Sequence, residues 1–271
     1  MRLTRPALLV AAALLALYVP TASAQAGPPA PKAAETLTRV TGAPVEIPDE
    51  YPAVLHTARA DCPAGQVPTG GGVTTYGNRF RFSITSSYAQ GGSWIVTGRN
   101  DDTLRAGTVA ATVICSTAPH RQVFGSRVAV ERGQVVTLHQ PCPSGQVPTG
   151  GGGRGDAERV VTQSSLPALN TWEISYWNNS GQTRTVEPFV VCSPAPHHVV
   201  AGRSGSISRG GTGTSQVQCP DGQQVTGGGG FSKNDTEIIL TSFENNGWRA
   251  TSASYSPDFQ QVAAFAVCTG S

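Results

Sequence analysis

The sequence predicts an all-β protein made of three tandem copies of one unit, and three observations support this. The frame Cys-Pro-x-Gly-Gln-x-x-Thr-Gly-Gly-Gly begins at Cys62, Cys142 and Cys219 without a gap in any copy. Each copy continues to a tryptophan and then to a second cysteine at the end of an apolar strand. Segments such as 79–85 and 172–176 alternate with the period of two that half-buried strands show, and no helical period is evident.

The N-terminal segment predicts secretion. Arg2 and Arg5 precede an apolar run over residues 7–17, and the small-residue sequence 22–24 follows. A basic start, a short apolar middle and an Ala-x-Ala end make a secretory signal peptide, so we expect residues 1–24 to be removed and the protein to be extracellular. Residues 25–39 are rich in proline and predict a flexible leader. No other stretch is long and apolar enough for membrane insertion after cleavage.

The repeats are predicted to cover residues 40–119, 120–196 and 197–271. A Val-x-Gly signal opens them at Val40, Val123 and Val200, which lie 83 and 77 residues apart. We expect each unit to form one sheet of four to six short strands. The glycine triplets predict close approach of two backbones, because a phosphate loop would need a helix and a lysine beside it. The repeated tryptophan is interpreted as part of the core.

Six cysteines on an exported chain indicate three disulfides. Equivalent positions in the three copies favour one bridge within each unit. Bridges that join neighbouring units with the same symmetry are the alternative. The favoured pairs are Cys62–Cys115, Cys142–Cys192 and Cys219–Cys268.

The charge balance argues against two classes of partner. Removal of residues 1–24 takes away two of the 19 Lys and Arg residues, which leaves 17 against 17 Asp and Glu residues. A neutral chain without a basic cluster lacks the electrostatic footprint of a nucleic-acid-binding protein and the polybasic patch of a membrane-surface protein. We therefore expect neither partner.

The Cys-Pro-x-Gly opening, the Gly-Gly-Gly run and the late apolar strand ending in cysteine resemble repeat units of secreted actinobacterial proteins, mostly of unassigned function. The three Cys-Pro-x-Gly units also resemble the vitelline membrane outer layer protein family, whose later Asp-Asp-Thr-Ala-Leu-Asn pattern is matched only in part, at residues 101–104. That resemblance implies a β-prism, with three antiparallel sheets around a pseudo-threefold axis, as in certain lectins. A β-trefoil or three separate small β domains are the alternatives, and the lack of long linkers favours one closed body.

Few groups in the sequence could carry catalysis. There is no Gly-x-Ser-x-Gly or His-Glu-x-x-His motif, and no cysteine is left after pairing. The pairs Asp156/Glu158 and Asp235/Glu237 could serve calcium or acid–base chemistry, but a charged strand edge explains them more simply. His120 and His197 fall in connectors. We expect no catalytic residue, no metal ligand and no cofactor, and a non-enzymatic role is favoured.

Positions at which the copies differ are the candidates for recognition. We align the residues that follow the shared tryptophan as 98–101 in the first copy, 176–179 in the second and 253–256 in the third. The candidate ligand-binding residues are Arg99, Asn100, Trp177, Asn178 and Tyr255, although solvated turns would also tolerate such variation. The sequence thus predicts a secreted non-catalytic binding protein, lectin-like or docking onto an extracellular protein. A secreted hydrolase of carbohydrate or peptide and a structural coat or matrix protein are the alternatives.

Overall fold

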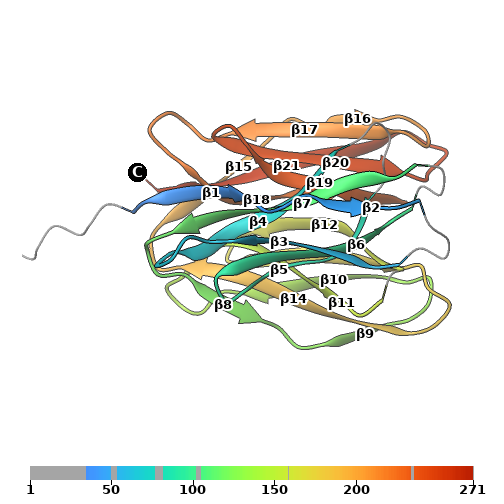
Figure 1. Ribbon diagram of the computed structural model, residues 1–271, viewed down its shortest axis with the longest axis horizontal. Coiled ribbons are helices and arrows are strands. Elements are labelled where there is room, and N and C mark those ends of the chain that lie inside the picture. The colour runs from blue at the N-terminus through green and yellow to red at the C-terminus, as the bar shows by residue number, and fades with distance from the viewer. Residues whose placement is uncertain are drawn as a thin grey trace, which may run out of the picture. The chain divides into compact units, whose positions relative to one another are not determined.

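The computed structural model describes residues 35–49, 54–76, 82–101, 105–157, 159–232 and 235–270, and within these ranges its regular structure consists of antiparallel β-strands. The predicted signal peptide and most of the predicted leader lie outside the described residues. The strands run in the following order (Figure 1): β1 (Leu37–Thr41), β2 (Val45–Ile47), β3 (His56–Asp61), β4 (Val67–Tyr76), β5 (Phe82–Gln90), β6 (Ser93–Asn100), β7 (Gly107–Ser116), β8 (Arg121–Phe124), β9 (Val128–Val130), β10 (Val135–Pro141), β11 (Val147–Gly155), β12 (Val160–Ala168), β13 (Thr171–Asn178), β14 (Arg184–Ser193), β15 (His197–Ala201), β16 (Gly205–Ile207), β17 (Thr212–Gln218), β18 (Val225–Ser232), β19 (Thr236–Glu244), β20 (Gly247–Ser254) and β21 (Gln260–Thr269).

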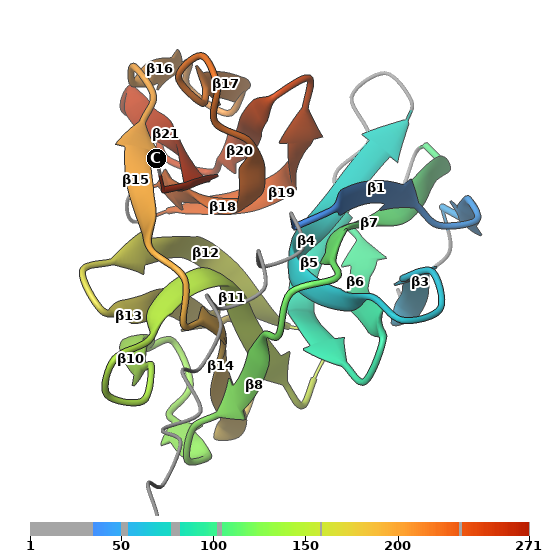
Figure 2. The ribbon, with the colours of Figure 1, turned by 90° about the vertical axis from the view of Figure 1, so that its left-hand side faces the viewer.

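One pattern of seven strands occurs three times and builds three seven-stranded sheets in a β-prism-like arrangement (Figure 2). Sheet A joins β1, β2, β7 and β4 of the first repeat to β19, β20 and β17 of the third. Sheet B joins β5, β6 and β3 of the first repeat to β11, β14, β8 and β9 of the second. Sheet C joins β12, β13 and β10 of the second repeat to β18, β21, β15 and β16 of the third. The predicted all-β class and its threefold repetition are thus confirmed.

The expectation of one sheet of four to six strands per repeat is wrong. Each repeat has seven strands and divides them between two sheets, and every sheet is completed by a neighbouring repeat. The junctions pair β4 with β19, β11 with β5 and β18 with β12. The first strand also starts earlier than predicted. β1 begins at Leu37, inside the stretch assigned to the leader, because residues 37–41 pair in antiparallel register with residues 112–116 of β7.

The Thr-Gly-Gly-Gly runs lie where the three repeats meet. In each copy the threonine is the extra residue of a β-bulge. The residues before and after it pair with the neighbouring strand, whereas the threonine does not. Thr69 Oγ1 donates to the carbonyl of Thr226, and Thr149 Oγ1 donates to the carbonyl of Thr69 at 2.8 Å. A Cβ on Gly70 would lie 2.6 Å from the Cα of Gly227. The first glycine is therefore a contact between repeats.

The second glycine of each triplet makes room for the tryptophan of the same repeat. A Cβ on Gly71 would lie 2.5 Å from the indole of Trp94, and the same clash recurs in the other two copies. All three tryptophans, Trp94, Trp172 and Trp248, are fully buried. The Trp94 indole N–H donates to Ser87 Oγ at 3.0 Å, and its counterparts donate to hydroxyls at equivalent places. The structural interpretation of both features agrees with this packing.

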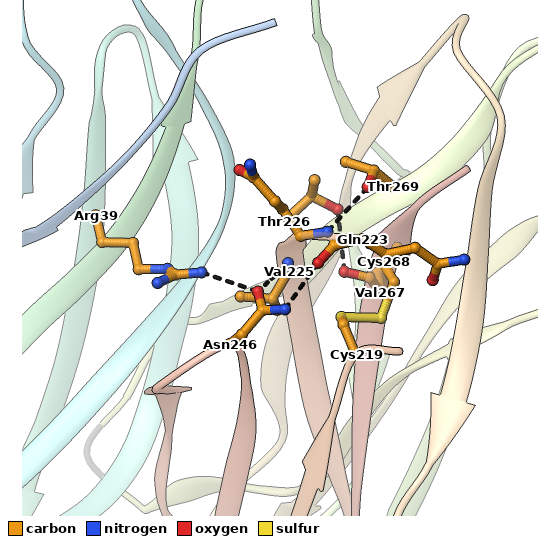
Figure 3. Close-up of a disulfide and its surroundings, with 10 residues drawn as sticks. Arg39, Cys219, Gln223, Val225, Thr226, Asn246, Val267, Cys268 and Thr269 are labelled. Carbon is orange, nitrogen blue, oxygen red and sulfur yellow. Dashed lines mark hydrogen bonds between the residues drawn. A yellow bond between two sulfur atoms is a disulfide. The ribbon is translucent and has the colours of Figure 1, made fainter. Parts of the chain in front are cut away.

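The three disulfides pair as predicted, within each repeat. They also connect different sheets, because the first cysteine follows β3, β10 or β17 and the second lies in β7, β14 or β21. Cys219–Cys268 thus links sheet A to sheet C (Figure 3). Close by, Arg39 of the first repeat donates to the Asn246 side chain of the third at 3.1 Å. The bridges and this contact hold the sheets together at one end of the strands, the disulfide end.

Candidate functional site

The opposite end of the strands, the loop end, carries the β2–β3, β4–β5 and β6–β7 connections and their counterparts. A hollow of about 320 Å³ opens there, and all three sheets contribute to it. We call it the axial hollow. It is lined by Arg99, Asp101, Arg159, Val161, Trp177, Asn179, Glu237 and Tyr255. Three of the five predicted ligand-binding residues, Arg99, Trp177 and Tyr255, are thus brought together although they lie on different repeats.

Strand register shows which positions of the three repeats are equivalent. Ser83 pairs with Arg99, Val161 with Trp177, and Glu237 with Ala253. The counterpart of Trp177 in the third repeat is therefore Ala253 and not Ser254, so the alignment assumed from the sequence was one residue out. Tyr255 accordingly corresponds to Asp101 and Asn179. The lining of the axial hollow is a set of equivalent positions at which the three repeats carry different side chains.

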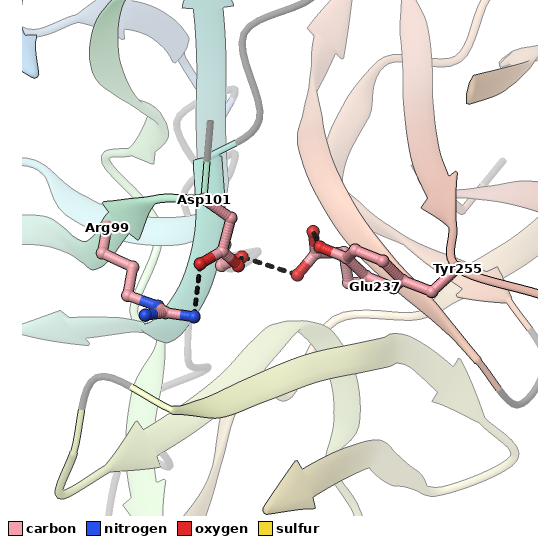
Figure 4. Close-up of polar contacts among 5 residues, drawn as sticks. Arg99, Asp101, Glu237 and Tyr255 are labelled. Carbon is pink, nitrogen blue, oxygen red and sulfur yellow. Dashed lines mark hydrogen bonds and ion pairs between the residues drawn. The ribbon is translucent and has the colours of Figure 1, made fainter. Parts of the chain in front are cut away.

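A buried polar cluster forms one wall of the axial hollow (Figure 4). Arg99, whose side chain is 7% exposed, makes an ion pair with Asp101. The Ser83 hydroxyl contacts both the Asp101 carboxylate and, at 2.6 Å, that of Glu237. The Tyr255 hydroxyl donates to the second oxygen of Glu237. Glu237 is 1% exposed, so its carboxylate is held by hydrogen bonds inside the protein and not by water.

The remaining lining residues are less engaged. The Trp177 side chain is partly exposed, and Arg159 and Asn179 are exposed at the rim. The Asn179 N–H donates to the Arg159 carbonyl at 2.8 Å, which is a hydrogen bond between backbones. Among the described residues, the Arg159 guanidinium, the Trp177 indole N–H and the Asn179 amide group have no side-chain partner. These groups are free to meet a ligand.

The other two predicted residues do not line the axial hollow. Asn178 is fully buried, and its amide donates to the carbonyls of Val130 and Gln182 at 2.8 and 2.9 Å. Asn100, its counterpart, donates in the same way to the carbonyls of Pro48 and Arg105. Both amides thus hold the connections at the loop end in place through hydrogen bonds to backbone carbonyls. An asparagine in a variable segment gives no sign of this role, because only the folded connections supply its acceptors.

Sequence reasoning missed Asp101, Arg159, Asn179 and Glu237 as members of one site. Glu237 belongs to an Asp-x-Glu pair that was interpreted as a charged strand edge, but its side chain turns inward and is buried. Residue 158 of the other pair lies outside the described residues. The sequence signal that could have found these residues is the difference between the repeats near the strand ends. In the folded protein, these strand ends meet around one axis.

Apolar side chains also gather at the loop end. Eight large hydrophobic side chains among the described residues are exposed, and six of them lie there. These six are Val54, Leu55, Tyr76, Val135, Tyr255 and Phe259. They come from strands and connections of all three sheets.

Two further hollows at the loop end each lie on a single sheet, of about 240 Å³ on sheet B and about 560 Å³ on sheet A. Arg154, which lines the first, has its guanidinium 4.0 Å from the ring centre of Tyr88 and 4.1 Å from that of Phe124. It also lies 3.5 Å from Glu187. This arginine is already used to cover aromatic rings, as cation–π pairs commonly do.

At the disulfide end, the structure brings His120 and His197 together, with ring centres 6.3 Å apart. Each Nδ1 lies about 3 Å from a backbone carbonyl, of Ala118 and Ala195 respectively, and each Nε2 is buried. Burial lowers the pKa of both imidazoles, and the nearby Glu35 opposes that shift. The described residues contain no group of three or more His, Cys, Asp or Glu side chains that could hold a metal ion.

Among the described residues, no helix has the length and apolar character that a membrane crossing requires. Comparison of the chain with models of known families and with curated proteins gives no match.

Proposed function

We propose that this protein is a secreted, non-catalytic glycan-binding protein whose ligand site is the axial hollow. The observation that carries the proposal is the convergence of Arg99, Trp177 and Tyr255 from three sheets on one hollow, at positions where the repeats differ. The hollow also has the volume of a small-molecule site, about 320 Å³.

The chemistry of the lining supports a sugar. Trp177 and Tyr255 offer aromatic faces against which the apolar face of a sugar ring can pack. The arginine and asparagine side chains beside them can exchange hydrogen bonds with ring hydroxyls. A few oriented polar groups among apolar ones are what a binding pocket needs for specificity.

Binding is favoured over hydrolysis because the two carboxyl groups of the hollow are engaged internally. Asp101 is paired with Arg99 and Ser83, while Glu237 contacts Ser83 and the Tyr255 hydroxyl. A hydrolase would need one of them to reach the scissile bond as an acid or nucleophile. Release of reducing sugar that is abolished by Glu237→Gln would replace this proposal with the hydrolase alternative.

Secretion is supported by the three disulfides, which persist in oxidising compartments. The proposal places the mature N-terminus at Gln25, which follows the Ala-x-Ala sequence. N-terminal sequencing of protein recovered from culture medium tests this directly.

The function is tested with a glycan array, followed by isothermal titration of the best ligand into the mature protein. Trp177→Ala should weaken binding by about 1 kcal/mol or more while the melting temperature stays unchanged, because the third repeat folds with Ala253 at this position. Leu169→Asn is the matched control, since this exposed residue lies at the other end of the same hairpin. Equal affinity of folded Trp177→Ala would remove the axial hollow as the site. Binding to an extracellular protein but to no glycan would favour the docking alternative.

A further inference from the structure

The axial hollow offers hydrogen-bond donors and few free acceptors. Its two carboxylates accept from groups of the protein itself, Asp101 from Arg99 and Glu237 from Tyr255, with Ser83 between them. The unengaged groups among the described lining residues are mainly N–H donors, namely the Arg159 guanidinium and the Trp177 indole N–H.

The positive and negative side chains of the axial hollow also lie at different depths below the protein surface. Glu237 is 1% exposed and the Asp101 side chain 18% exposed, so the negative groups lie at the inner wall. Arg159 is exposed at the rim, where its guanidinium has no ion-pair partner among the described residues. Arg99 gives one terminal nitrogen to Asp101, and its Nε has no partner. Among the residues that line the axial hollow, the exposed charge at the rim is therefore the positive charge of Arg159.

We propose, on the basis of the glycan-binding function above, that the ligand is an acidic glycan whose carboxylate is bound by Arg159 while a sugar ring packs on Trp177. A guanidinium presents two parallel N–H groups that match the two oxygens of a carboxylate, which gives both orientation and strength. Arg159 immediately precedes β12, and Trp177 pairs with Val161 of the same hairpin. The charged contact and the aromatic contact thus come from the same hairpin and its flanking residue.

A matched set of glycans tests the inference. Oligogalacturonate, hyaluronan and alginate oligosaccharides are each titrated beside the same oligosaccharide with its carboxyl groups reduced to alcohols, which keeps the stereochemistry. The preferred acidic glycan should bind about tenfold more tightly than its reduced form, as expected for a hydrogen bond between charged groups. The preference should shrink as sodium chloride is raised, because the rim is exposed to screening ions.

Two arginine variants show where the preference comes from. Arg159→Gln should remove most of the preference for the acidic form and leave binding of the reduced form within about twofold. Arg132→Gln removes the same charge from an exposed position of the same repeat that does not line the axial hollow, and it should change neither. Equal binding of acidic and reduced glycans, or an unchanged preference in Arg159→Gln, would overturn this inference and leave glycan binding in place. Failure of the wild-type protein to bind either form would overturn both proposals.

Discussion

Replacement of Gly71 by alanine should destabilise the protein strongly, although it adds one methyl group. The new Cβ would lie 2.4 Å from the Thr112 carbonyl oxygen and 2.5 Å from the Trp94 indole. Carbon atoms in good contact are separated by about 3.5–4.0 Å, so the indole would have to retreat by more than about 1 Å. Trp94 is fully buried and its N–H is bonded to Ser87, so a shift of the indole would strain that hydrogen bond and displace neighbouring core side chains.

Overpacking of a core typically costs about 1–3 kcal/mol, and we expect the upper end here because a backbone carbonyl and a fixed indole both resist. In a domain of this size, about 3 kcal/mol lowers the melting temperature by about 6–12 °C. Differential scanning calorimetry measures the change. Gly92→Ala is the control, because nothing lies within 4 Å of its Cβ position. A Gly71→Ala protein that melts with the wild type but has lost its ligand would refute the packing argument and make the glycines functional.

Three further predictions concern stability. Leu169→Gly should raise the free energy of unfolding by about 1 kcal/mol in urea titrations, because Leu169 is 95% exposed with φ at 53°, where the first repeat has a glycine; a loss of stability would show that the leucine is packed. Joint replacement of Cys142 and Cys192 by alanine should cost about 4 kcal/mol, since the bridge spans 50 residues, and a loss below about 1 kcal/mol would contradict the chain-entropy estimate. Stability should fall as the pH drops below about 6.5, because burial lowers the pKa of His120 and His197 and the unfolded chain then binds more protons than the folded one. Replacement of both histidines by phenylalanine should flatten that dependence, and an unchanged slope would assign it to other groups.

Repetition made much of the fold predictable. Cys62 and Cys115 could be paired from sequence because the same two positions recur in every copy, and chance does not preserve such spacing three times. The strand that pairs with β4 could not be predicted from the sequence. The hydrogen bonds between β4 and β19 join backbone groups, which do not depend on which repeat supplies the strand. Strand pairing between distant segments is decided by the packing of the whole body.

The candidate site was predictable in part for a related reason. Differences between copies pointed to Trp177 and Tyr255, which the structure places in one hollow. The same criterion wrongly included Asn178, whose acceptors are backbone carbonyls that only the folded connection brings near. It also passed over Glu237, because a carboxylate on a strand predicts exposure unless its hydroxyl partner on another repeat, Ser83, is known.

The exchange of strands between repeats has a consequence for biosynthesis. Sheet A needs β1, near the start of the described chain, and β20, near its end. These strands are synthesised some two hundred residues apart. The edge of β4 therefore stays unpaired until the third repeat has been synthesised. Until β19 pairs with it, β4 presents an unpaired strand edge, which is the kind of edge that can pair with another chain and aggregate.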